Sequence, residues 1–387
     1  MPTELRPTDA EDPRALLDAL RHALAGGPAL GFGMVAGEPE AVPDGTAVVI
    51  ATSGSTGIPK RVVLSGEALR AGAEATAARI GSGRWLLALP ATYVAGLQVL
   101  VRSVVAGTEP AILDGRFSAE AFAAATLSML RPDAGAGTGI PDLYTSLVPA
   151  QLATLLEAED SAAVRAALQA YRAILIGGQA LPEPLRDHAA ALGARLVRTY
   201  GSSETSGGCV YDGVPLDTVA VRVVDGELRI AGPMLADGYL GDDELTARTF
   251  TRDEHGIRWY RTGDLGLIED GIVRVHGRAD NVIVSGGINI SLDRVERIVR
   301  RVPGLTGAVV VPVDDARWGE ASVIVAPRGE ALRRSEAEQL AHARDAVAEE
   351  LGKHARPARL ILVDELDILP SGKPDREAIR RVVSELH

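Results

Sequence analysis

The chain has 387 residues, of which 46% are hydrophobic and 24% are charged, a size and composition typical of a soluble globular protein with two domains. Its formal net charge of −12 argues against nucleic acid or an anionic membrane as the main partner, because both would repel it. Cys209 is the sole cysteine, which excludes an intrachain disulfide and a cysteine-based zinc cluster. The sequence shows no signal-peptide core and no membrane-spanning apolar run, so we expect a cytoplasmic protein with no membrane insertion.

Up to about residue 200, strand and helix patterns alternate. Four leucines between residues 16 and 24 recur at helical spacing, and the β-branched segment 47–51 predicts a buried strand. Ser65 is placed to cap an alanine-rich helix over 66–80. Further strands are predicted at 85–89, 110–113, 173–176 and 195–199, and further helices at 94–105, 119–130, 152–156, 162–170 and 182–191. This alternation predicts a parallel sheet built from βαβ units.

After Tyr200 the pattern changes to antiparallel β-structure. Asp225-Gly226 and Asp270-Gly271 each separate two strand-like segments, which is the strongest short signal for a hairpin. The last hundred or so residues form a plausible separate unit. It mixes strands predicted at 307–313, 322–326 and 360–363 with helices predicted at 292–301, 336–351 and 376–386. The expected fold class is α/β, with parallel αβ sheets plus a small antiparallel β unit, followed by a small α+β domain.

A loop of hydroxyls and glycines follows the strand at 47–51 and reads Thr52-Ser53-Gly54-Ser55-Thr56-Gly57-Ile58-Pro59-Lys60. Glycines let backbone N–H groups approach an anion, hydroxyls add donors and the lysine adds charge, so the loop is suited to a polyphosphate. It is not a Walker A loop, because Ile58-Pro59 separates Gly57 from Lys60. Such a loop alone is more often a surface turn, so its interpretation depends on the motifs that follow.

Five further motifs follow in order. They are Gly177-Gly178-Gln179, Tyr200-Gly201-Ser202-Ser203-Glu204, Tyr260-Arg261-Thr262-Gly263-Asp264, Gly277-Arg278-Ala279-Asp280-Asn281 with Gly286-Gly287, and Leu369-Pro370-Ser371-Gly372-Lys373. The first follows a strand, and the carboxyl end of a parallel strand is where open α/β sheets bind ligands. Each motif alone has a plain structural explanation, such as a turn or a surface ion pair. Their occurrence together and in this order is the informative observation.

The set resembles the motifs of the adenylate-forming superfamily, which includes acyl-CoA synthetases, luciferases and adenylation domains. The resemblance implies that the protein uses Mg²⁺ as a cofactor and ATP and CoA as co-substrates. The nucleotide-binding residues that it implies are Thr52, Ser53, Gly54, Ser55, Thr56, Gly57, Lys60, Gly177, Gly178, Gln179, Tyr200, Ser203, Asp264 and Arg278. The catalytic residues that it implies are Lys373, Glu204 and Arg278, with Glu204 also holding Mg²⁺.

The same resemblance assigns roles to individual side chains. Tyr200 stacks on adenine, Ser203 bonds the α-phosphate, and Asp264 accepts hydrogen bonds from both ribose hydroxyls, which suits an acceptor-only carboxylate. Arg278 contacts ribose. Lys373 bridges the substrate carboxylate and the α-phosphate, where a point charge stabilises the developing negative charge.

The resemblance also divides the chain. It implies an ATP- and acyl-substrate-binding domain over 1–277, a hinge over 278–281 centred on Asp280, and a mobile C-terminal domain over 282–387 that carries the catalytic lysine. Gly286 and Gly287 would line the pantetheine tunnel for CoA after the C-terminal domain rotates.

Within the superfamily the whole chain resembles the actinobacterial-type o-succinylbenzoate-CoA ligases of menaquinone biosynthesis. Segments 90–103, 177–182 and 204–216 carry this closer resemblance. The acyl-substrate residues that it implies are Thr92, Tyr93, Gly96, Gly201 and Ser202. Two departures stand out, because these ligases normally carry a histidine at the position of Thr92 or its neighbour, and usually a second aspartate at the position of Asn281.

The expected partners are therefore a small-molecule carboxylic acid, ATP and CoA, with o-succinylbenzoate as the expected acid. A ligase for another aryl or acyl acid and an adenylation enzyme that loads a carrier protein share every nucleotide motif and stay open. A non-catalytic nucleotide-binding or scaffold protein is disfavoured by intact Lys373, Glu204 and Asp264. The sequence leaves the oligomeric state open, and a homodimer is compatible with it.

Overall fold

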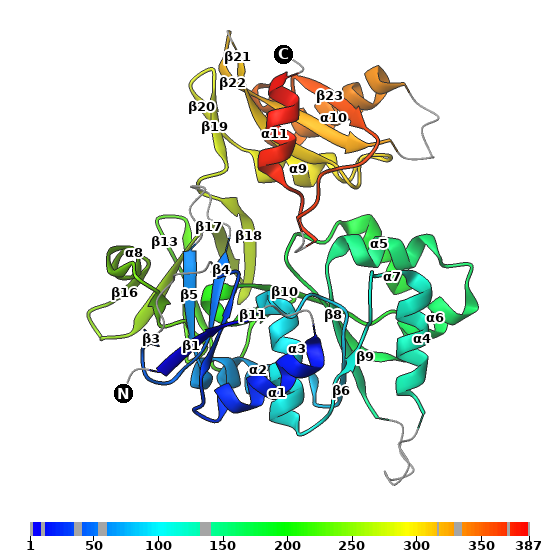
Figure 1. Cartoon of the computed structure of the whole chain (residues 1–387). Helices are drawn as coiled ribbons and strands as arrows, with labels where there is room; N and C mark the ends of the chain where they lie inside the picture. The colour runs from blue at the N-terminus through cyan, green and yellow to red at the C-terminus, as the bar shows by residue number, and fades with distance from the viewer. Residues whose placement is uncertain are drawn as a thin grey trace.

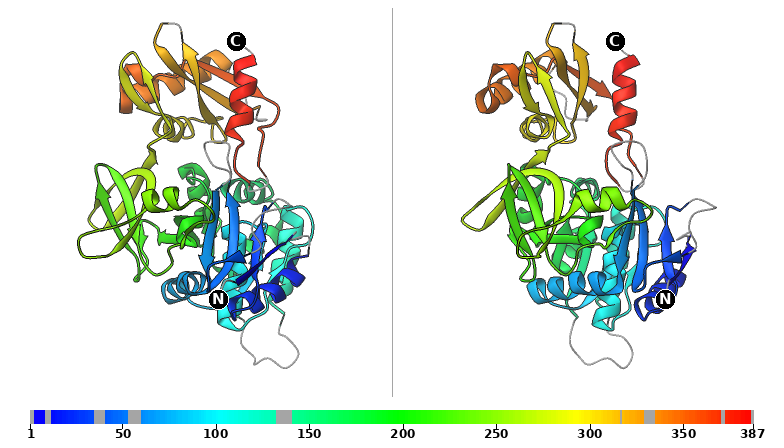
Figure 2. Two further views of the ribbon diagram at one scale, coloured as in Figure 1. Left: turned by 60° about the vertical axis from the view of Figure 1, so that its left-hand side comes forward. Right: turned by 90° about the vertical axis from the view of Figure 1, so that its left-hand side faces the viewer.

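The computed structural model describes residues 3–8, 12–34, 41–52, 60–131, 141–315, 317–328, 335–369 and 372–385. These segments form a large N-terminal unit and a smaller C-terminal unit (Figure 1). The smaller unit lies at one end of the molecule in both rotated views as well (Figure 2). The α/β fold class expected from the sequence is confirmed.

The first sheet has six strands in the order β15-β5-β4-β2-β1-β3. The strands are β1 Thr3–Pro7, β2 Ala29–Phe32, β3 Ala41–Val42, β4 Thr46–Thr52, β5 Lys60–Ser65 and β15 Gly238–Tyr239. Strands β1, β2 and β4 are parallel, whereas β5 returns antiparallel to β4. Strand β5 was not predicted, and because of it the hydroxyl-rich loop joins two antiparallel neighbours.

The second sheet has seven strands in the order β12-β11-β10-β9-β8-β6-β7, with β10, β9, β8, β6 and β7 parallel. Parallel strands were predicted at the positions of β6, β7, β9 and β10, whereas β8 was not predicted. The strands are β6 Arg84–Leu87, β7 Ala111–Ile112, β8 Leu143–Leu147, β9 Tyr171–Ile176, β10 Leu196–Ser202, β11 Gly207–Tyr211 and β12 Val214–Pro215. The carboxyl ends of β9 and β10 carry two of the predicted motifs.

Helices cover these sheets and share their cores. They are α1 Pro13–Leu24, α2 Gly66–Ile80, α3 Val94–Ala106, α4 Ala119–Met129, α5 Pro149–Glu157, α6 Ala162–Ala170 and α7 Glu183–Ala191. Helix α2 has the predicted bounds, because the Ser65 hydroxyl accepts a hydrogen bond from the Ala68 N–H at 3.2 Å. One core cluster joins Leu69 of α2 and Leu97 of α3 to strands of both sheets, so these helices fasten the two sheets together.

A third sheet is antiparallel and contains both predicted hairpins. Its strands are β13 Ala220–Val224, β14 Glu227–Ala231, β16 Phe250–Arg252, β17 Arg258–Glu269 and β18 Ile272–Arg278, and α8 Asp243–Thr249 lies beside it. Asp225, Gly226, Asp270 and Gly271 all have positive φ, as the tight turns between these strands require. Strand β18 ends at Arg278, the first residue of the predicted hinge.

The C-terminal unit is a five-stranded sheet with helices packed against it. Its elements are β19 Val282–Ser285, β20 Ile288–Ser291, α9 Leu292–Val299, β21 Val309–Asp315, β22 Gly319–Pro327, α10 Glu336–Leu351, β23 Arg359–Val363 and α11 Arg376–Glu385. Arg376 donates to both carboxylate oxygens of the buried Glu296, at 2.9 and 2.7 Å, which anchors the start of α11 to α9.

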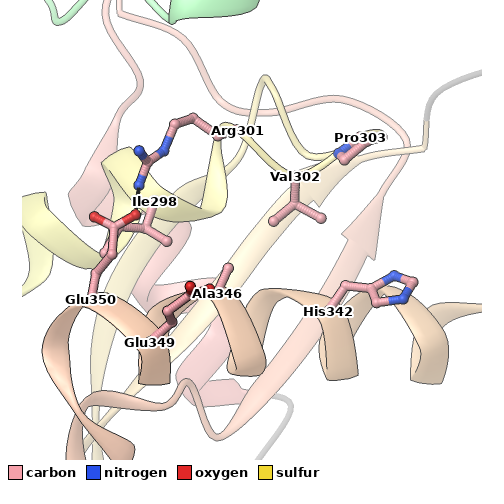
Figure 3. Close-up of a pocket in the computed structure, with 8 residues that line it drawn as sticks. All are labelled: Ile298, Arg301, Val302, Pro303, His342, Ala346, Glu349 and Glu350. Atoms are coloured by element: carbon pink, nitrogen blue, oxygen red, sulfur yellow. Dashed lines mark hydrogen bonds and ion pairs between the residues drawn. The ribbon is translucent and has the colours of Figure 1, made fainter.

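A shallow hollow lies between α9 and α10, beside an ion pair between Arg301 and Glu350 (Figure 3). It contains none of the predicted site residues. In the described part of the chain no helix is long and apolar enough to cross a bilayer.

Candidate active site

The predicted residues converge where β9 and β10 end, opposite the segment that precedes α11. This segment descends from the C-terminal unit to the N-terminal end of α5 (Figure 1). Gln179 Nε2 donates to the Gly372 carbonyl at 3.2 Å, and the Lys373 Cε lies 3.5 Å from the place where a Cβ on Gly178 would stand. The glycine motif after β9 and the C-terminal lysine motif are therefore in direct contact.

Gly372 fits closely against the N-terminal unit. Its φ is +77°, and a Cβ there would lie 2.9 Å from Val148 Cγ2 at the start of α5. The Leu369 N–H donates to the Lys373 carbonyl at 2.8 Å, and the Gly372 N–H donates to the Leu369 carbonyl at 2.8 Å. This turn directs the Lys373 side chain into the large unit.

Burial lowers the pKa of Lys373 below its ordinary value of 10.5, and the nearby Glu204 carboxylate opposes the shift. The lysine is thus a desolvated cation close to a carboxylate. Such a group gains more from a bound anion than an exposed lysine would, because the surrounding medium screens the interaction less.

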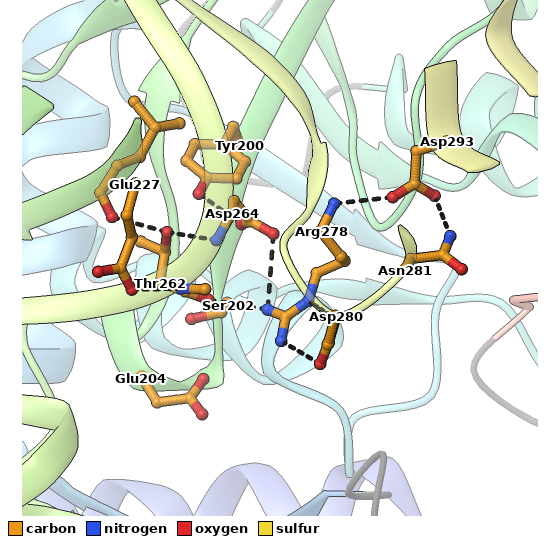
Figure 4. A network of polar contacts seen from close by, with 12 residues as sticks. Tyr200, Ser202, Glu204, Glu227, Thr262, Asp264, Arg278, Asp280, Asn281 and Asp293 are labelled. Atoms are coloured by element: carbon orange, nitrogen blue, oxygen red, sulfur yellow. Dashed lines mark hydrogen bonds and ion pairs between the residues drawn. The ribbon is translucent and has the colours of Figure 1, made fainter. Parts of the chain in front are cut away.

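Tyr200, Asp264 and Arg278 form one network at the edge of the site (Figure 4). The Tyr200 hydroxyl donates to Asp264 Oδ2 at 2.6 Å, and Arg278 Nη1 lies 3.5 Å from Asp264 Oδ1. Burial raises the pKa of Asp264, while the bonds from Tyr200 and Arg278 oppose this rise. Strand β10 and the β17–β18 pair thereby place an aromatic ring and a carboxylate side by side, as a nucleoside requires.

Glu204 follows β10 in the short 3-10 turn Ser203–Thr205. Its Oε1 accepts a hydrogen bond from the Tyr239 hydroxyl at 2.9 Å, and the Lys60 Nζ lies 5.8 Å from the centre of the Tyr239 ring. Thr52 and Lys60 face each other across β4 and β5, and Thr52 Oγ1 donates to the Lys60 carbonyl at 3.2 Å. The other predicted loop residues, Ser53, Gly54, Ser55, Thr56 and Gly57, lie outside the described residues.

The two units meet at Arg278 and Asp280. Arg278 donates to both Asp280 oxygens, from Nε to Oδ1 at 3.0 Å and from Nη2 to Oδ2 at 3.0 Å. Its Nη1 also donates to the Thr262 carbonyl at 2.8 Å. The Arg278 guanidinium lowers the pKa of Asp280. A bidentate pair thus joins the predicted hinge residue Asp280 to the network of Tyr200, Asp264 and Arg278, which we call the nucleotide network.

Two family models match this chain. The model for AMP-binding enzymes matches residues 7–240, and the model for the C-terminal domain of these enzymes matches residues 294–373.

The chain belongs to the AMP-binding enzyme family.

Individual relatives of this AMP-binding enzyme agree with the closer resemblance noted in the sequence. A probable 2-succinylbenzoate–CoA ligase from Mycobacterium tuberculosis is 42% identical over 352 residues, covering 89% of this chain and 87% of that protein. The o-succinylbenzoate CoA synthetase of Bacillus subtilis, solved with the acyl-adenylate intermediate OSB-AMP, has a TM-score of 0.72 at 25% identity, covering 94% of this chain and 80% of that one. ATP-bound MatB from Rhodopseudomonas palustris, at 22% identity, a TM-score of 0.74 and coverages of 90% and 71%, supports the fold alone.

The acyl residues predicted for this AMP-binding enzyme lie at the start of α3 and the end of β10. Tyr93 immediately precedes α3, and partial burial raises its pKa. Close packing also requires glycine at positions 96 and 201. A Cβ on Gly96 would lie 2.2 Å from the Pro90 carbonyl oxygen, and a Cβ on Gly201 would lie 2.0 Å from the Gly207 carbonyl oxygen. Thr92 and Ser202 are half-buried. Contact of these five residues with an acyl group stays a prediction.

Gly286 and Gly287 form the turn between β19 and β20, with φ of +57° and +80°. A Cβ on Gly286 would lie 2.9 Å from the ring of the half-exposed Trp318. This turn lies at the end of β19 remote from the junction (Figure 1). The arrangement that brings Lys373 into the site therefore keeps the two predicted CoA-tunnel residues apart from it.

Tyr239 is a site residue that the sequence analysis missed. It lies on β15, which pairs with β5, so its hydroxyl reaches Glu204 only through a long-range contact. We expect Tyr239→Phe to lower ATP–pyrophosphate exchange about tenfold, because one hydrogen bond that orients a charged group is lost. Tyr144→Phe is the matched control, since the Tyr144 hydroxyl bonds the Ile80 carbonyl far from Glu204. Equal exchange rates in Tyr239→Phe and wild type would contradict this role.

The lowered pKa of Lys373 predicts a pH dependence. We expect the lysine to act as a cation, so kcat/KM for ATP in adenylate formation should fall as the pH rises through this pKa, below the ordinary lysine value of 10.5. Tyr200 and Tyr239 have raised pKa values, so they titrate above the ordinary tyrosine value and do not cause this fall. Lys373→Arg should abolish this fall of kcat/KM at high pH, the alkaline limb of the pH profile, because arginine stays protonated. An unchanged limb in that variant would disprove the assignment.

Proposed function

We propose that this chain is an ATP-dependent acid–CoA ligase that converts 2-succinylbenzoate into its CoA thioester through an acyl-adenylate. The observation that carries the proposal is the meeting of Lys373 with the glycine motif after β9, beside Glu204 and the Tyr200–Asp264 pair. The identity with the mycobacterial ligase supports the choice of acid.

In the first step a carboxylate oxygen of the acid attacks the α-phosphorus of ATP. The bond between the α-phosphorus and the bridging oxygen breaks, and pyrophosphate leaves. Lys373 and Lys60 offset the negative charge that develops on the phosphoryl oxygens. Asp264 accepts hydrogen bonds from the ribose hydroxyls, and Tyr200 holds the adenine ring, so the α-phosphate is fixed relative to Lys373.

Glu204 fits the Mg²⁺ that we propose to accompany ATP. Magnesium prefers carboxylate and phosphate oxygens and retains several waters. Within the described ranges no group of three or more His, Cys, Asp or Glu side chains is placed to hold a metal. When bound, Mg²⁺ neutralises charge on the pyrophosphate leaving group.

In the second step the CoA thiol attacks the carbonyl carbon of the acyl-adenylate. The carbon–oxygen bond to AMP breaks, AMP leaves, and the thiol proton passes to solvent. We infer that the C-terminal unit, over 282–387, rotates about 278–281 between the steps, since the Lys373-in arrangement keeps Gly286 and Gly287 away from the site. Cys209 is fully buried and burial raises its pKa to about 12, so a protein thiolate plays no part.

The acceptor in the second step separates this proposal from a carrier-protein-loading enzyme. The chain is incubated with ATP, Mg²⁺ and 2-succinylbenzoate, and either CoA or a phosphopantetheinylated carrier protein is added. We expect AMP release and a CoA thioester, detected by mass spectrometry, with CoA only. Acylation of the carrier protein with no CoA thioester would overturn the proposed acceptor and leave the first step intact.

A further inference from the structure

Helix α9 of the C-terminal unit packs directly on strand β18 of the large unit. Asp293, in the first turn of α9, accepts a hydrogen bond from the Arg278 N–H at Oδ2, at 2.7 Å. Its other oxygen, Oδ1, accepts from the Asn281 side-chain amide at 2.7 Å. One carboxylate thus binds both ends of the short segment that joins the two units (Figure 4).

Two neighbouring contacts also hold α9 against β18. A Cβ on Gly277 would lie 2.6 Å from Asp293 Cβ, so Gly277 lets α9 approach the end of β18 closely. Arg297, one turn further along α9, donates from Nη2 to the carbonyls of Val275 and His276 at 2.8 and 3.1 Å. Asp293 and Arg297 therefore hold the backbone of β18 from the same face of α9.

The contact between Asp293 and the Arg278 N–H can exist only in one arrangement of the units, whereas Asn281 holds Asp293 from the side of the C-terminal unit. Arg278 ends β18 in the large unit, whereas Asp293 lies on α9 in the small one. A rotation about residues 279–281 moves Asp293 away from the Arg278 N–H. The arrangement in which they meet is also the one in which Lys373 reaches Gly178.

We propose that Asp293 is a positioning residue for acyl-adenylate formation, which holds Lys373 in the site by pairing with Asn281 and the Arg278 N–H. The inference rests on the proposed function, because it assumes that the units rotate between the two half-reactions. Asp293 acts through the position of the C-terminal unit and through no contact with substrate.

Asn281 is one of the two departures from the pattern that the family resemblance implies, which has an aspartate at this position. The Asn281 amide is a donor, so it complements the Asp293 carboxylate. An ionised aspartate at 281 would offer acceptors only, and two carboxylates would face each other at hydrogen-bond distance. The pairing therefore depends on one donor and one acceptor, which makes it testable by exchange of the two residues.

The experiment measures the two half-reactions separately in Asn281→Asp. ATP–pyrophosphate exchange with 2-succinylbenzoate reports the first, and conversion of synthetic acyl-adenylate by CoA reports the second. We expect exchange to fall about tenfold, the effect of one lost charge-assisted hydrogen bond, while the second half-reaction stays within about twofold of wild type. The double variant Asn281→Asp/Asp293→Asn restores a donor–acceptor pair and should recover exchange to within about threefold.

Asp314→Asn is the control, because Asp314 is an exposed carboxylate of the same unit, and both of its half-reactions should match wild type. Normal exchange in Asn281→Asp would overturn the proposal. Equal loss in both half-reactions with no recovery in the double variant would also overturn it, since that pattern indicates general damage to the fold.

A second readout needs no acyl substrate. Spin labels at Glu254→Cys and Glu349→Cys, exposed positions of the large and small units, report the distance between the units, and buried Cys209 stays unlabelled. We expect one narrow distance distribution with wild-type residues at 281 and 293, broadening in Asn281→Asp, and narrowing in the double variant. Identical distributions would overturn the positioning role. If the distance distributions are as expected but the protein shows no ATP–pyrophosphate exchange with any acid, the proposed function is rejected and the pairing of Asn281 with Asp293 stands.

Discussion

Replacing Lys373 by alanine is expected to slow acyl-adenylate formation by about 10²–10³-fold, the usual cost of removing one group that stabilises transition-state charge. Lys373 is the cation that the C-terminal unit brings to Gly178, and it is desolvated near Glu204. The effect should appear in kcat of ATP–pyrophosphate exchange more than in KM, because the charge that Lys373 offsets grows as pyrophosphate leaves.

The same variant should convert synthetic acyl-adenylate and CoA at nearly the wild-type rate, since we propose that Lys373 is withdrawn in that step. Lys353→Ala is the matched control, because Lys353 is an exposed lysine of the same unit, and it should leave both half-reactions unchanged. Exchange that survives Lys373→Ala intact would remove the lysine from the mechanism.

Replacing Asp264 by alanine is expected to weaken binding of ATP and of AMP by roughly 10²–10⁴-fold. Two hydrogen bonds from the ribose hydroxyls to a carboxylate are lost, and each bond to a charged group contributes about 1.5–3 kcal/mol. The change also removes the acceptor of the Tyr200 hydroxyl, which now lies 2.6 Å from Asp264 Oδ2. The Tyr200 ring, which we propose to stack on adenine, therefore loses the contact that fixes its position.

Calorimetric titration with AMP measures this effect without catalysis. Asp264→Asn keeps one acceptor oxygen and should show an intermediate loss of affinity. Asp217→Ala is the control, because Asp217 is exposed and pairs with Arg79, away from the nucleotide network. An AMP dissociation constant in Asp264→Ala equal to that of wild type would show that this carboxylate does not bind the ribose.

Local signals in the sequence predicted much of the fold. Helix α2 was expected over 66–80 and occupies Gly66–Ile80, because the Ser65 cap and the Gly81 end are both encoded locally. The two Asp-Gly turns likewise predicted their hairpins. Helix ends were less certain, as in α9, which was expected to reach residue 301 and ends at Val299.

Strands β1, β2, β5 and β8 were not predicted. Strands β1 and β2 are short and pair with each other across helix α1, whereas β5 pairs with β4 directly across the hydroxyl-rich loop. Strand β5 lies between the hydroxyl-rich loop and the Ser65 cap of α2, so the sequence pattern predicted a loop that leads directly to the helix.

The site shows the same division between local and tertiary information. Lys373, Asp264 and Glu204 lie in recognisable motifs and were predicted, whereas Tyr239 and Asp293 were not. Their roles arise only when β15 pairs with β5 and when α9 packs on β18. The motifs identified the residues expected to touch nucleotide, and the fold was needed to find those that hold them in place.

The most direct test of the proposed ligase is CoA-dependent AMP release with 2-succinylbenzoate, measured beside benzoate, salicylate and fatty acids. We expect 2-succinylbenzoate to give by far the highest kcat/KM, which would also show that the Thr92-Tyr93 pair serves in place of the histidine usual in this segment. Strong activity with a different acid and none with 2-succinylbenzoate would contradict the assigned substrate and make the start of α3 the mark of a changed acyl pocket.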